Sequence, residues 1–586
     1  MTDAGQLLLF PRPQQLELHH EKAPLDAPVR ETRADGLPAE GYELDISAAG
    51  VDLRYGDDNG LRYGRVTLGQ IRAQATDALP GLSVRDWPDF PARGYMLDIS
   101  RDRVPTRATL ERLVELMALA RINQFQLYTE HTFAYRDHEV VWRDASPMTP
   151  DDIRWLDELC RSRGIELVPN QNCFGHMARW LRHDDYRHRA ETPDGYELLP
   201  GVTSPPTVLA PTADNADFAM SLFDELLPHF TSRQVNIGCD ETFELGKGVS
   251  ADAVALVGKE AVYIEHLRRL VEPLVERGYT VQFWADIARK EPDLVKTLPA
   301  GAVAVAWNYE APRAPGETAP LPSSVAAVLD SLGIDFEAFA GFETNVAPLA
   351  DAGVPFWVAP GTSSWNSLVG RIDNAMANIV DAADVGRARG ATGFLLTDWG
   401  DNGHLQPPSV SFGPLLYAGA VSWAAHANRD LDLPAALDRY VFDDPNVSVG
   451  EVLDRVGRLW RRTGQRTFNA SPLQAALAPS QGHLVMGEPD AAKVAAVIDE
   501  LDAAIAELER WTPACSEHLV TQRELLHACR MARHGARRLA AQAGATTPSP
   551  EEMEKDRAAL AAEHEACWLL RSRPGGLPDS LRALRT

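Results

Sequence analysis

Apolar and polar residues follow two different patterns along the first 430 residues of the chain. Residues 42–46 and 51–55 alternate one by one, the period of half-buried strands, and 61–75 follow as a predicted helix. From Gly94 onward, short apolar runs typical of buried strands alternate with stretches of helical spacing. The predicted strands of this second region are 95–99, 124–128, 166–169, 234–238, 280–284, 302–307, 356–359 and 393–397.

Strands that alternate with helices over residues 95–397 favour a (β/α)8 TIM barrel, an α/β fold. Helices are predicted at 106–120, 252–277 and 373–389, and another begins at Thr149 with Pro150 and Asp152 as start signals. An open doubly wound sheet is the alternative. That fold usually carries a Gly-rich phosphate fingerprint after its first strand, which this sequence lacks.

After about residue 430 the strand-like runs stop, and 491–511, 519–543 and 549–573 have helical apolar spacing. We therefore predict a small α/β domain over 1–88, a barrel over 89–430 and a C-terminal α-helical domain over 431–586. Residues 311–322 are Pro-rich and predict a loop. Three roles stay open for the C-terminal helices: closing a pocket, forming a homodimer or buttressing the barrel.

Charge and composition exclude several classes of partner. The 586 residues carry a formal net charge of −26, which argues against binding nucleic acid or anionic membranes. No apolar run is long enough to span a bilayer. The N-terminus lacks a basic leader, and the six cysteines form no CxxC pair, so we predict a cytoplasmic protein with reduced thiols.

Asp240 and Glu241 stand side by side directly after the predicted strand 234–238. Two adjacent, partly buried acids repel each other, which drives their pKa values apart and lets one donate a proton while the other stays ionised. The alternative is a helix N-terminus, where acids are favoured beside the positive end of the helix dipole. The pair alone does not decide between these interpretations.

In a barrel, the loops after the strands build the active site. The residues in these loops that carry chemistry are Glu130, His131, His176, Trp284, Asp286, Trp307, Tyr309, Trp365, Asn366, Trp399, Asp401 and His404. Indole faces stack on sugar rings, while acids and amides bind hydroxyls, so the set points to a carbohydrate. A metal site built from the histidines and acids is a weaker alternative, because no HxH or HExxH spacing occurs.

Several stretches resemble glycoside hydrolase family 20, the β-N-acetylhexosaminidases. The resemblance covers residues 1 to about 430 and rests on 90–94, 98–101, 238–241, 283–284 and 398–401. It implies an exo-acting enzyme without metal or organic cofactor, in which the 2-acetamido oxygen of the substrate is the nucleophile. The implied substrate is an oligosaccharide or glycoconjugate with terminal β-linked N-acetylglucosamine or N-acetylgalactosamine.

The resemblance also implies roles for individual residues. Glu241 would protonate the leaving oxygen and later deprotonate water, while ionised Asp240 holds the acetamido N–H. His176 and Glu130 would form a supporting relay. The implied sugar-binding residues are Arg93 at the 3- and 4-hydroxyls, Asp401 at the 4- and 6-hydroxyls, and Trp284, Trp307 and Trp399 as pocket walls.

Two positions depart from the family pattern. The family usually has His and Asp after its second strand, where this chain has Tyr128-Thr129-Glu130-His131. It also places a Tyr after the seventh strand, where this chain has Trp365-Asn366, and Asn366 or Tyr309 are the candidate substitutes. Two alternatives therefore stay open: a barrel glycosidase acting on a differently substituted β-glycoside, and a sugar-binding protein without turnover.

Overall fold

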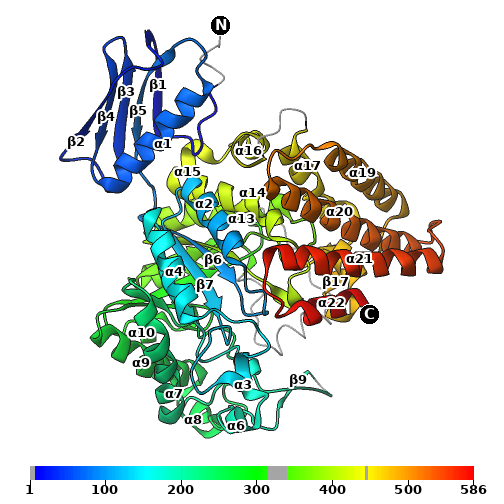
Figure 1. The fold of residues 1–586 in the computed structure, drawn as a ribbon. Helices are drawn as coiled ribbons and strands as arrows, with labels where there is room; N and C mark the ends of the chain where they lie inside the picture. The colour runs from blue at the N-terminus through cyan, green and yellow to red at the C-terminus, as the bar shows by residue number, and fades with distance from the viewer. Residues whose placement is uncertain (1–6, 200, 314–338, 443–446, 586) are drawn as a thin grey trace.

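The computed structural model describes residues 7–199, 201–313, 339–442 and 447–585. A five-stranded sheet covered by one helix forms an N-terminal lobe, drawn in blue in Figure 1. Its strand order is β1-β5-β3-β4-β2, and only β2 and β4 pair in parallel. Its elements are β1 (Gln15–Ala23), β2 (Val29–Arg33), β3 (Tyr42–Ser47), β4 (Gly50–Tyr55), α1 (Asp58–Gln74) and β5 (Leu79–Asp86).

The two strands and the helix predicted in this lobe are confirmed, and the helix begins earlier than predicted. The side chain of Asp57 accepts a hydrogen bond from the backbone N–H of Gly60, which caps the first turn of α1. The sequence missed β1, β2 and β5. Eight of the nine residues of β1 are exposed, so that strand has no buried face to create an alternating pattern.

Eight parallel strands close into a barrel, which confirms the predicted (β/α)8 fold. Going around the ring, the order is β11-β12-β13-β14-β15-β6-β7-β8. Each predicted strand is present, displaced by a few residues at most. The bounds are β6 (Ala92–Asp98), β7 (Gln124–Thr129), β8 (Glu166–Gln171), β11 (Gln234–Asn236), β12 (Thr280–Trp284), β13 (Ala302–Trp307), β14 (Phe356–Ala359) and β15 (Gly393–Asp398).

Helices surround the barrel, and one predicted helix is split. The expected helix over 252–277 is two, because Gly258 adopts φ 91° between them. Thr149 and Asp152 form the reciprocal capping box at the start of α4, as their spacing predicts. The longer helices are α2 (Arg107–Leu119), α4 (Pro150–Ser162), α7 (Ala213–Leu226), α8 (Ala251–Val257), α9 (Lys259–Glu276), α12 (Phe342–Asp351), α13 (Ile372–Arg389) and α14 (Phe412–Trp423).

Short elements interrupt the connections of the barrel. They are α3 (Glu139–Trp142), α5 (Ala178–Leu181), α6 (Asp184–Arg187), α10 (Pro292–Val295) and the hairpin of β9 (Tyr196–Leu199) with β10 (Val202–Ser204). The predicted loop over 311–322 lies outside the described residues from position 314 onward.

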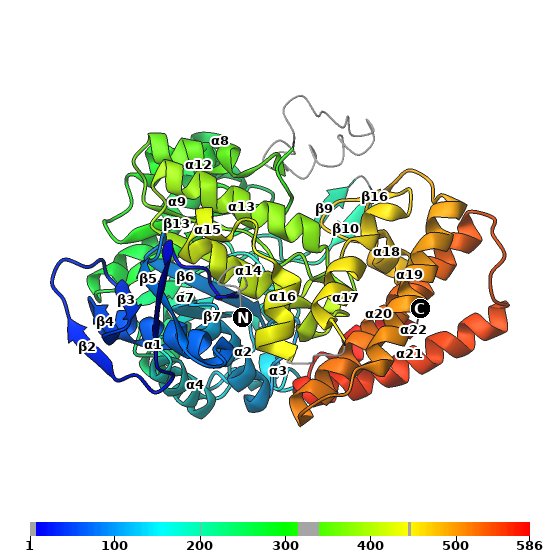
Figure 2. The same ribbon diagram turned by 90° about the horizontal axis from the view of Figure 1, so that it is seen from above.

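The C-terminal region is mainly helical and packs along one flank of the barrel, in orange and red in Figure 2. The three long helices predicted there are confirmed as α19, α20 and α21. The prediction that strands stop after residue 430 is wrong, because the two short strands β16 and β17, of two residues each, pair with one another. The elements are α15 (Ala425–Asn428), α16 (Leu433–Leu437), α17 (Val449–Val456), β16 (Arg466–Thr467), α18 (Pro472–Leu477), β17 (Val485–Met486), α19 (Ala491–Arg510), α20 (Ser516–Gln542), α21 (Pro550–Arg571) and α22 (Leu577–Arg585).

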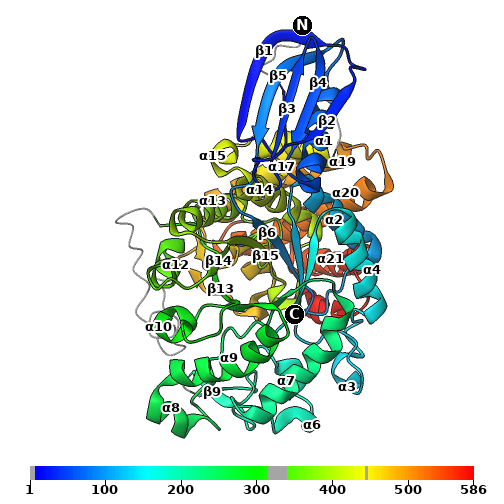
Figure 3. The same ribbon diagram turned by 90° about the vertical axis from the view of Figure 1, so that its left-hand side faces the viewer.

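The N-terminal lobe, at the top in Figure 3, attaches to the barrel through buried polar contacts around Trp423. The indole N–H of Trp423 donates to Asp86 at 2.9 Å, and Arg121 lies over the same ring. Arg121 also bonds Asp86 at 2.5 Å. The exact limits of the three domains stay a prediction. Among the described residues, no helix is both long enough and apolar enough to cross a membrane.

Candidate active site

A pocket of about 790 Å³ opens at the carboxyl ends of the barrel strands. Its charged lining residues come from the loops after five of the strands, and part of its rim comes from the C-terminal region. The lining residues are Arg101, His176, Asp240, Glu241, Trp307, Tyr309, Glu310, Phe339, Trp399, Asp401, Phe468, Asn469, Gly482, His483, Leu484 and Val485. Such a volume is typical of a small-molecule site.

The turn that carries Asp240 and Glu241 is held in an unusual backbone conformation. Gly238, Cys239 and Glu241 have φ angles of 70°, 73° and 51°. A Cβ at Gly238 would lie 2.4 Å from the side chain of Asn172, so only glycine fits. Non-glycine residues at positive φ are strained, and such residues concentrate at functional sites. The helix-start interpretation of the pair is wrong, since the next helix begins only at Ala251.

Asp240 is buried and held as an anion. Its Oδ1 accepts a hydrogen bond from Asn172 Nδ2 at 2.7 Å, and its Oδ2 lies 3.2 Å from His176 Nε2. Burial alone would raise the pKa of Asp240, but the charge of His176 and the bond from Asn172 lower it below its ordinary value. Asp240 is therefore an ionised hydrogen-bond acceptor at neutral pH.

Glu241 has the opposite tendency. Its side chain is 41% exposed and faces the pocket, whereas that of Asp240 is 8% exposed. Burial by the surrounding protein nevertheless raises the pKa of Glu241. The charge of His176 lowers this pKa, and the charges of Asp240 and Asp401 raise it further. The pKa of Asp240 is thus lowered and that of Glu241 raised, as expected for an anion beside a proton donor.

Asp286, after β12, fixes the backbone of Glu241. Its Oδ2 accepts the Glu241 N–H at 3.0 Å. Burial and the nearby Asp240 raise the pKa of Asp286 to about 7. Asp286 therefore restrains a turn whose positive φ would otherwise be costly to hold.

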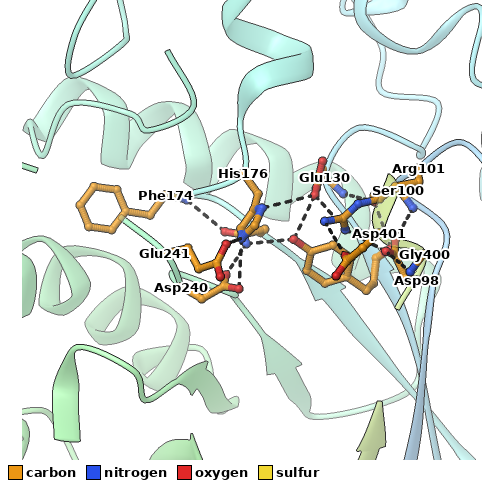
Figure 4. Close-up of polar contacts among 12 residues, drawn as sticks. Asp98, Ser100, Arg101, Glu130, Phe174, His176, Asp240, Glu241, Gly400 and Asp401 are labelled. Carbon is orange, nitrogen blue, oxygen red and sulfur yellow. Dashed lines mark hydrogen bonds and ion pairs between the residues drawn. The ribbon is translucent and has the colours of Figure 1, made fainter. Parts of the chain in front are cut away.

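His176 contacts both acids and a third carboxylate (Figure 4). Its Nε2 lies 3.4 Å from Glu241 Oε2, and its Nδ1 lies 3.8 Å from Glu130 Oε1. Burial opposes a charge on this ring, but Asp240, Glu241 and Glu130 outweigh it and raise the pKa of His176 to about 10. His176 is thus a cation at neutral pH, and the structure brings Glu130 and His176 together as the resemblance implied.

Arg101 lies on the other side of the pocket, among carboxylates (Figure 4). It contacts Asp98 at 2.8 Å, Asp401 at 3.3 Å and Glu130 at 3.4 Å. Its guanidinium also lies over the ring of Trp399. A fixed arginine fork beside Asp401 presents donors and acceptors together, the combination that binds adjacent sugar hydroxyls.

Aromatic rings complete the pocket in two layers. Trp307, Tyr309 and Trp399 line it, and the indole N–H of Trp399 donates to the Tyr309 hydroxyl at 2.8 Å. Trp284 and Trp365 are almost fully buried behind this layer, against Trp399 and Tyr309 respectively. Trp365 therefore supports Tyr309 rather than lining the pocket.

The structure corrects the assignment of Arg93. This residue lies near the start of β6, at the end of the barrel away from the pocket, and its side chain is fully buried. It pairs with Glu40 of the N-terminal lobe at 2.7 Å and donates to the carbonyl oxygens of Phe90 and Arg121. Arg93 cannot reach a sugar in the pocket, and Arg101 is the arginine that lies there.

Asn366 also differs from its expected place. It is not among the lining residues of the pocket, and its amide contacts protein on both sides. Its Nδ2 donates to the Asn469 carbonyl at 3.4 Å, its Oδ1 accepts from Asn402 at 3.1 Å, and its backbone carbonyl accepts from the Ser471 N–H at 2.8 Å. Asn366 connects the loop after β14 to the C-terminal region.

The histidines proposed as alternative metal ligands do not converge. His131 pairs with Asp102 at 2.6 Å, and His404 is buried, with its backbone carbonyl accepting from Arg103 at 3.3 Å; neither residue lines the pocket. In the parts of the chain that the structure describes, no three His, Cys, Asp or Glu side chains are placed to hold a metal ion.

Sequence reasoning missed Arg101, Asp286 in its restraining position, and the C-terminal lining residues. Arg101 follows the first strand of the barrel, so its position after that strand could have identified it. Asp286 follows the fifth strand in the same way. The C-terminal residues lie far along the chain from the barrel strands and carry no motif, so only the tertiary structure places them in the pocket.

Comparisons with known proteins agree on one family. Residues 90–321 match the catalytic domain of glycosyl hydrolase family 20, and residues 8–87 match domain 2 of that family. The chain is similar to a beta-hexosaminidase of Akkermansia muciniphila, with 25% identity over 308 residues, 48% of this chain and 62% of that protein. It is also similar to beta-hexosaminidase subunit beta of Mus musculus, with 25% identity over 315 residues, 48% of this chain and 55% of the relative.

These matches leave part of both relatives uncovered, since the chain spans less than two thirds of the length of either. Among solved structures, the chitobiase of Flavobacterium johnsoniae superposes with a TM-score of 0.55 at 15% identity, covering 97% of this chain and 100% of that one. At this identity the likeness supports the fold alone.

Proposed function

The chain belongs to glycosyl hydrolase family 20, and from this premise we propose that it is an exo-acting β-N-acetylhexosaminidase. The proposed substrate is an oligosaccharide or glycoconjugate with a terminal β-linked N-acetylglucosamine or N-acetylgalactosamine. The observation that carries the proposal is the pair Asp240 and Glu241, whose pKa values are shifted in opposite directions at one pocket. Hydrolysis with substrate assistance needs this division between an anion and an acid.

We propose that the first step breaks the glycosidic bond without an enzyme nucleophile. The acetamido oxygen of the substrate attacks the anomeric carbon, while the leaving oxygen takes the proton of Glu241. The product of this step is an oxazolinium ion. In this proposal Asp240 accepts the acetamido N–H, and its negative charge stabilises the positive charge that develops on that group.

In the second step, water attacks the anomeric carbon from the side that the leaving group vacated. Glu241, now ionised, takes a proton from this water. The bond between the anomeric carbon and the acetamido oxygen breaks, which opens the oxazolinium ring and restores the acetamido group. Two inversions at the same carbon give a product of retained β configuration. The cation of His176, within 3.4 Å of both acids, would keep Asp240 ionised through both steps.

Tyr309 is our candidate for the hydroxyl that binds the acetamido oxygen. Its oxygen accepts from the Trp399 N–H at 2.8 Å, and the residue lines the pocket. Trp365 packs edge-on against the ring with centroids 5.1 Å apart and restrains its orientation. The tyrosine that the family pattern places after the seventh strand would thus be replaced from the loop after the sixth.

A panel of 4-nitrophenyl β-glycosides tests the proposal. We expect release from the N-acetylglucosaminide or the N-acetylgalactosaminide, and slow or no release from the glucoside and galactoside. Asp240→Asn and Glu241→Gln should each abolish most of this activity while the protein stays folded. Activity on glucoside or galactoside alone would favour a glycosidase for a differently substituted substrate, and hydrolysis of none would favour a sugar-binding protein.

A further inference from the structure

Two strained turns carry Arg101 and Asp401, the pair that meets at 3.3 Å beside the pocket (Figure 4). Asp102, directly after Arg101, has φ 62°. In the turn after Asp401, Asn402 and His404 have φ 60° and 55°. Non-glycine residues at positive φ are costly and persist only where the surrounding structure restrains them. The positions of the two charged groups therefore depend on what supports these turns from behind.

Residues 572–580, which we call the C-terminal brace, lie against both turns. They connect α21 with the first turn of α22. Gly576 is so close to the first turn that a Cβ there would lie 2.7 Å from the carbonyl oxygen of Arg101. A Cβ on Gly403, in the second turn, would lie 3.4 Å from the Cα of Ser580. The brace thus packs closely against the backbone of both turns.

Hydrogen bonds fix the brace on both of its sides. Arg103 donates from its Nε to the Ser572 hydroxyl and from its Nη1 to the His404 carbonyl, each at 3.3 Å. This one side chain therefore joins the brace to the turn after Asp401. Toward α21, the Ser580 hydroxyl lies 2.8 Å from His564 Nε2, and both side chains are buried.

A chain of ion pairs links the brace to the turn after Arg101. Asp579 pairs with Arg179 at 2.8 Å, and Arg179 lies 3.4 Å from the buried Asp102. Asp102 also pairs with His131 at 2.6 Å. Asp579, Arg179 and Asp102 are not lining residues of the pocket, so they do not contact a ligand in it directly.

We propose that the C-terminal brace positions Arg101 and Asp401 and thereby sets how tightly the protein holds the hydroxyls of the terminal sugar. The inference rests on the proposed hexosaminidase activity and assigns the brace a part in recognition of that sugar. Donors and acceptors that are fixed before binding cost less to order around a ligand. The residues of the brace act through the two turns and are positioning residues.

Two substrates separate positioning from a purely structural role. One is 4-nitrophenyl N-acetyl-β-glucosaminide, and the other is its 4,6-dideoxy analogue, which lacks the hydroxyls assigned to Asp401. The wild type should prefer the parent by at least about tenfold in kcat/KM, because the analogue leaves charged groups unpaired. In Gly576→Ala the added methyl group must displace the Arg101 backbone. We expect kcat/KM for the parent to fall about tenfold, mainly through KM, and that for the analogue less than about twofold.

Gly544→Ala is the matched control. Gly544 follows α20 and has φ 73°, close to the 69° of Gly576, but a Cβ there would meet none of the described residues within 4 Å. Alanine is strained at positive φ in both places, and only Gly576→Ala presses on Arg101. Gly544→Ala should therefore keep the KM and the substrate preference of the wild type.

Arg179→Ala is a second variant, which decides the question if Gly576→Ala does not fold. The Arg179 side chain is 27% exposed, so its loss is easier to accommodate. We expect KM for the parent to rise about threefold and the preference to fall with it, because one partly exposed ion-pair link is lost. Arg179→Lys, which keeps the charge, should retain most of the preference.

Steady-state kinetics of the folded variants gives distinct outcomes. Equal losses on both substrates, an unchanged preference in the variants, or an active wild type without any preference would overturn the positioning role and leave the hexosaminidase proposal intact. A wild type that hydrolyses neither substrate would refute the hexosaminidase proposal and this inference with it.

Discussion

Replacing His176 by asparagine tests how the charges of the pocket are coupled. The cation of His176 lowers the pKa of Asp240 and that of Glu241, so its removal raises both. Activity requires ionised Asp240, which sets the acidic limb of the pH profile, and protonated Glu241, which sets the basic limb. Because both pKa values rise, we expect both limbs to move to higher pH.

The size of the loss follows from the distances. At 3.2 Å and an effective dielectric constant of about 20, the gross attraction between His176 and Asp240 is about 5 kcal/mol. Breaking one partner of a buried ion pair costs about 3–5 kcal/mol. If about 3 kcal/mol of this cost falls on the transition state, kcat/KM at neutral pH drops roughly a hundredfold.

The assay is kcat/KM for a 4-nitrophenyl N-acetylhexosaminide, measured from pH 3 to pH 9 for the wild type and His176→Asn. His131→Asn is the matched control, because it also removes a histidine–carboxylate contact, of 2.6 Å to Asp102, but outside the pocket lining. Its pH limits should match those of the wild type. A His176→Asn profile that keeps its position or moves to lower pH would refute the electrostatic reasoning.

Substitutions at four further residues test other contacts of the protein. Arg101→Ala should lower kcat/KM about a hundredfold, because charged hydrogen bonds contribute about 1.5–3 kcal/mol each. Arg93→Ala should instead lower the midpoint of thermal unfolding and leave kcat/KM within about threefold of the wild-type value. Tyr309→Phe should lower kcat on the N-acetyl substrate about a hundredfold if its hydroxyl binds the acetamido oxygen. Asp286→Ala should lower kcat about tenfold by freeing the Glu241 backbone, while Asp286→Asn, which retains an acceptor oxygen, should lose less. Equal behaviour of the two Asp286 variants in steady-state kinetics would contradict the restraining role.

The barrel could be predicted from the sequence because most of its strands are buried runs rich in apolar residues. β15, for example, is buried at all six of its positions, and such runs separated by helical spacing have few other solutions. The mainly exposed β1 gave no such signal. The split between α8 and α9 depends on one glycine at positive φ, and a glycine within a helical pattern does not reveal its φ angle.

The site could be predicted in its centre and less well at its margins. Asp240 and Glu241 follow a strand directly, so the rule that barrel loops carry the chemistry was sufficient to find them. Arg93 was misplaced because the motif resemblance outweighed its position at the start of β6, whereas Arg101 satisfied both criteria. The contribution of Phe468 and Val485 depends on tertiary packing across the chain, which no local pattern encodes.

Binding of a thiazoline analogue of the oxazolinium ion tests substrate assistance most directly. This compound presents the fused five-membered ring that forms when the acetamido oxygen attacks the anomeric carbon. Titration calorimetry of the wild type should give binding at least about a hundredfold tighter than that of N-acetylglucosamine, as expected of a mimic of the intermediate, and Asp240→Asn should lose most of this gain. Equal affinity for both compounds in the wild type would contradict catalysis by the acetamido group of the substrate.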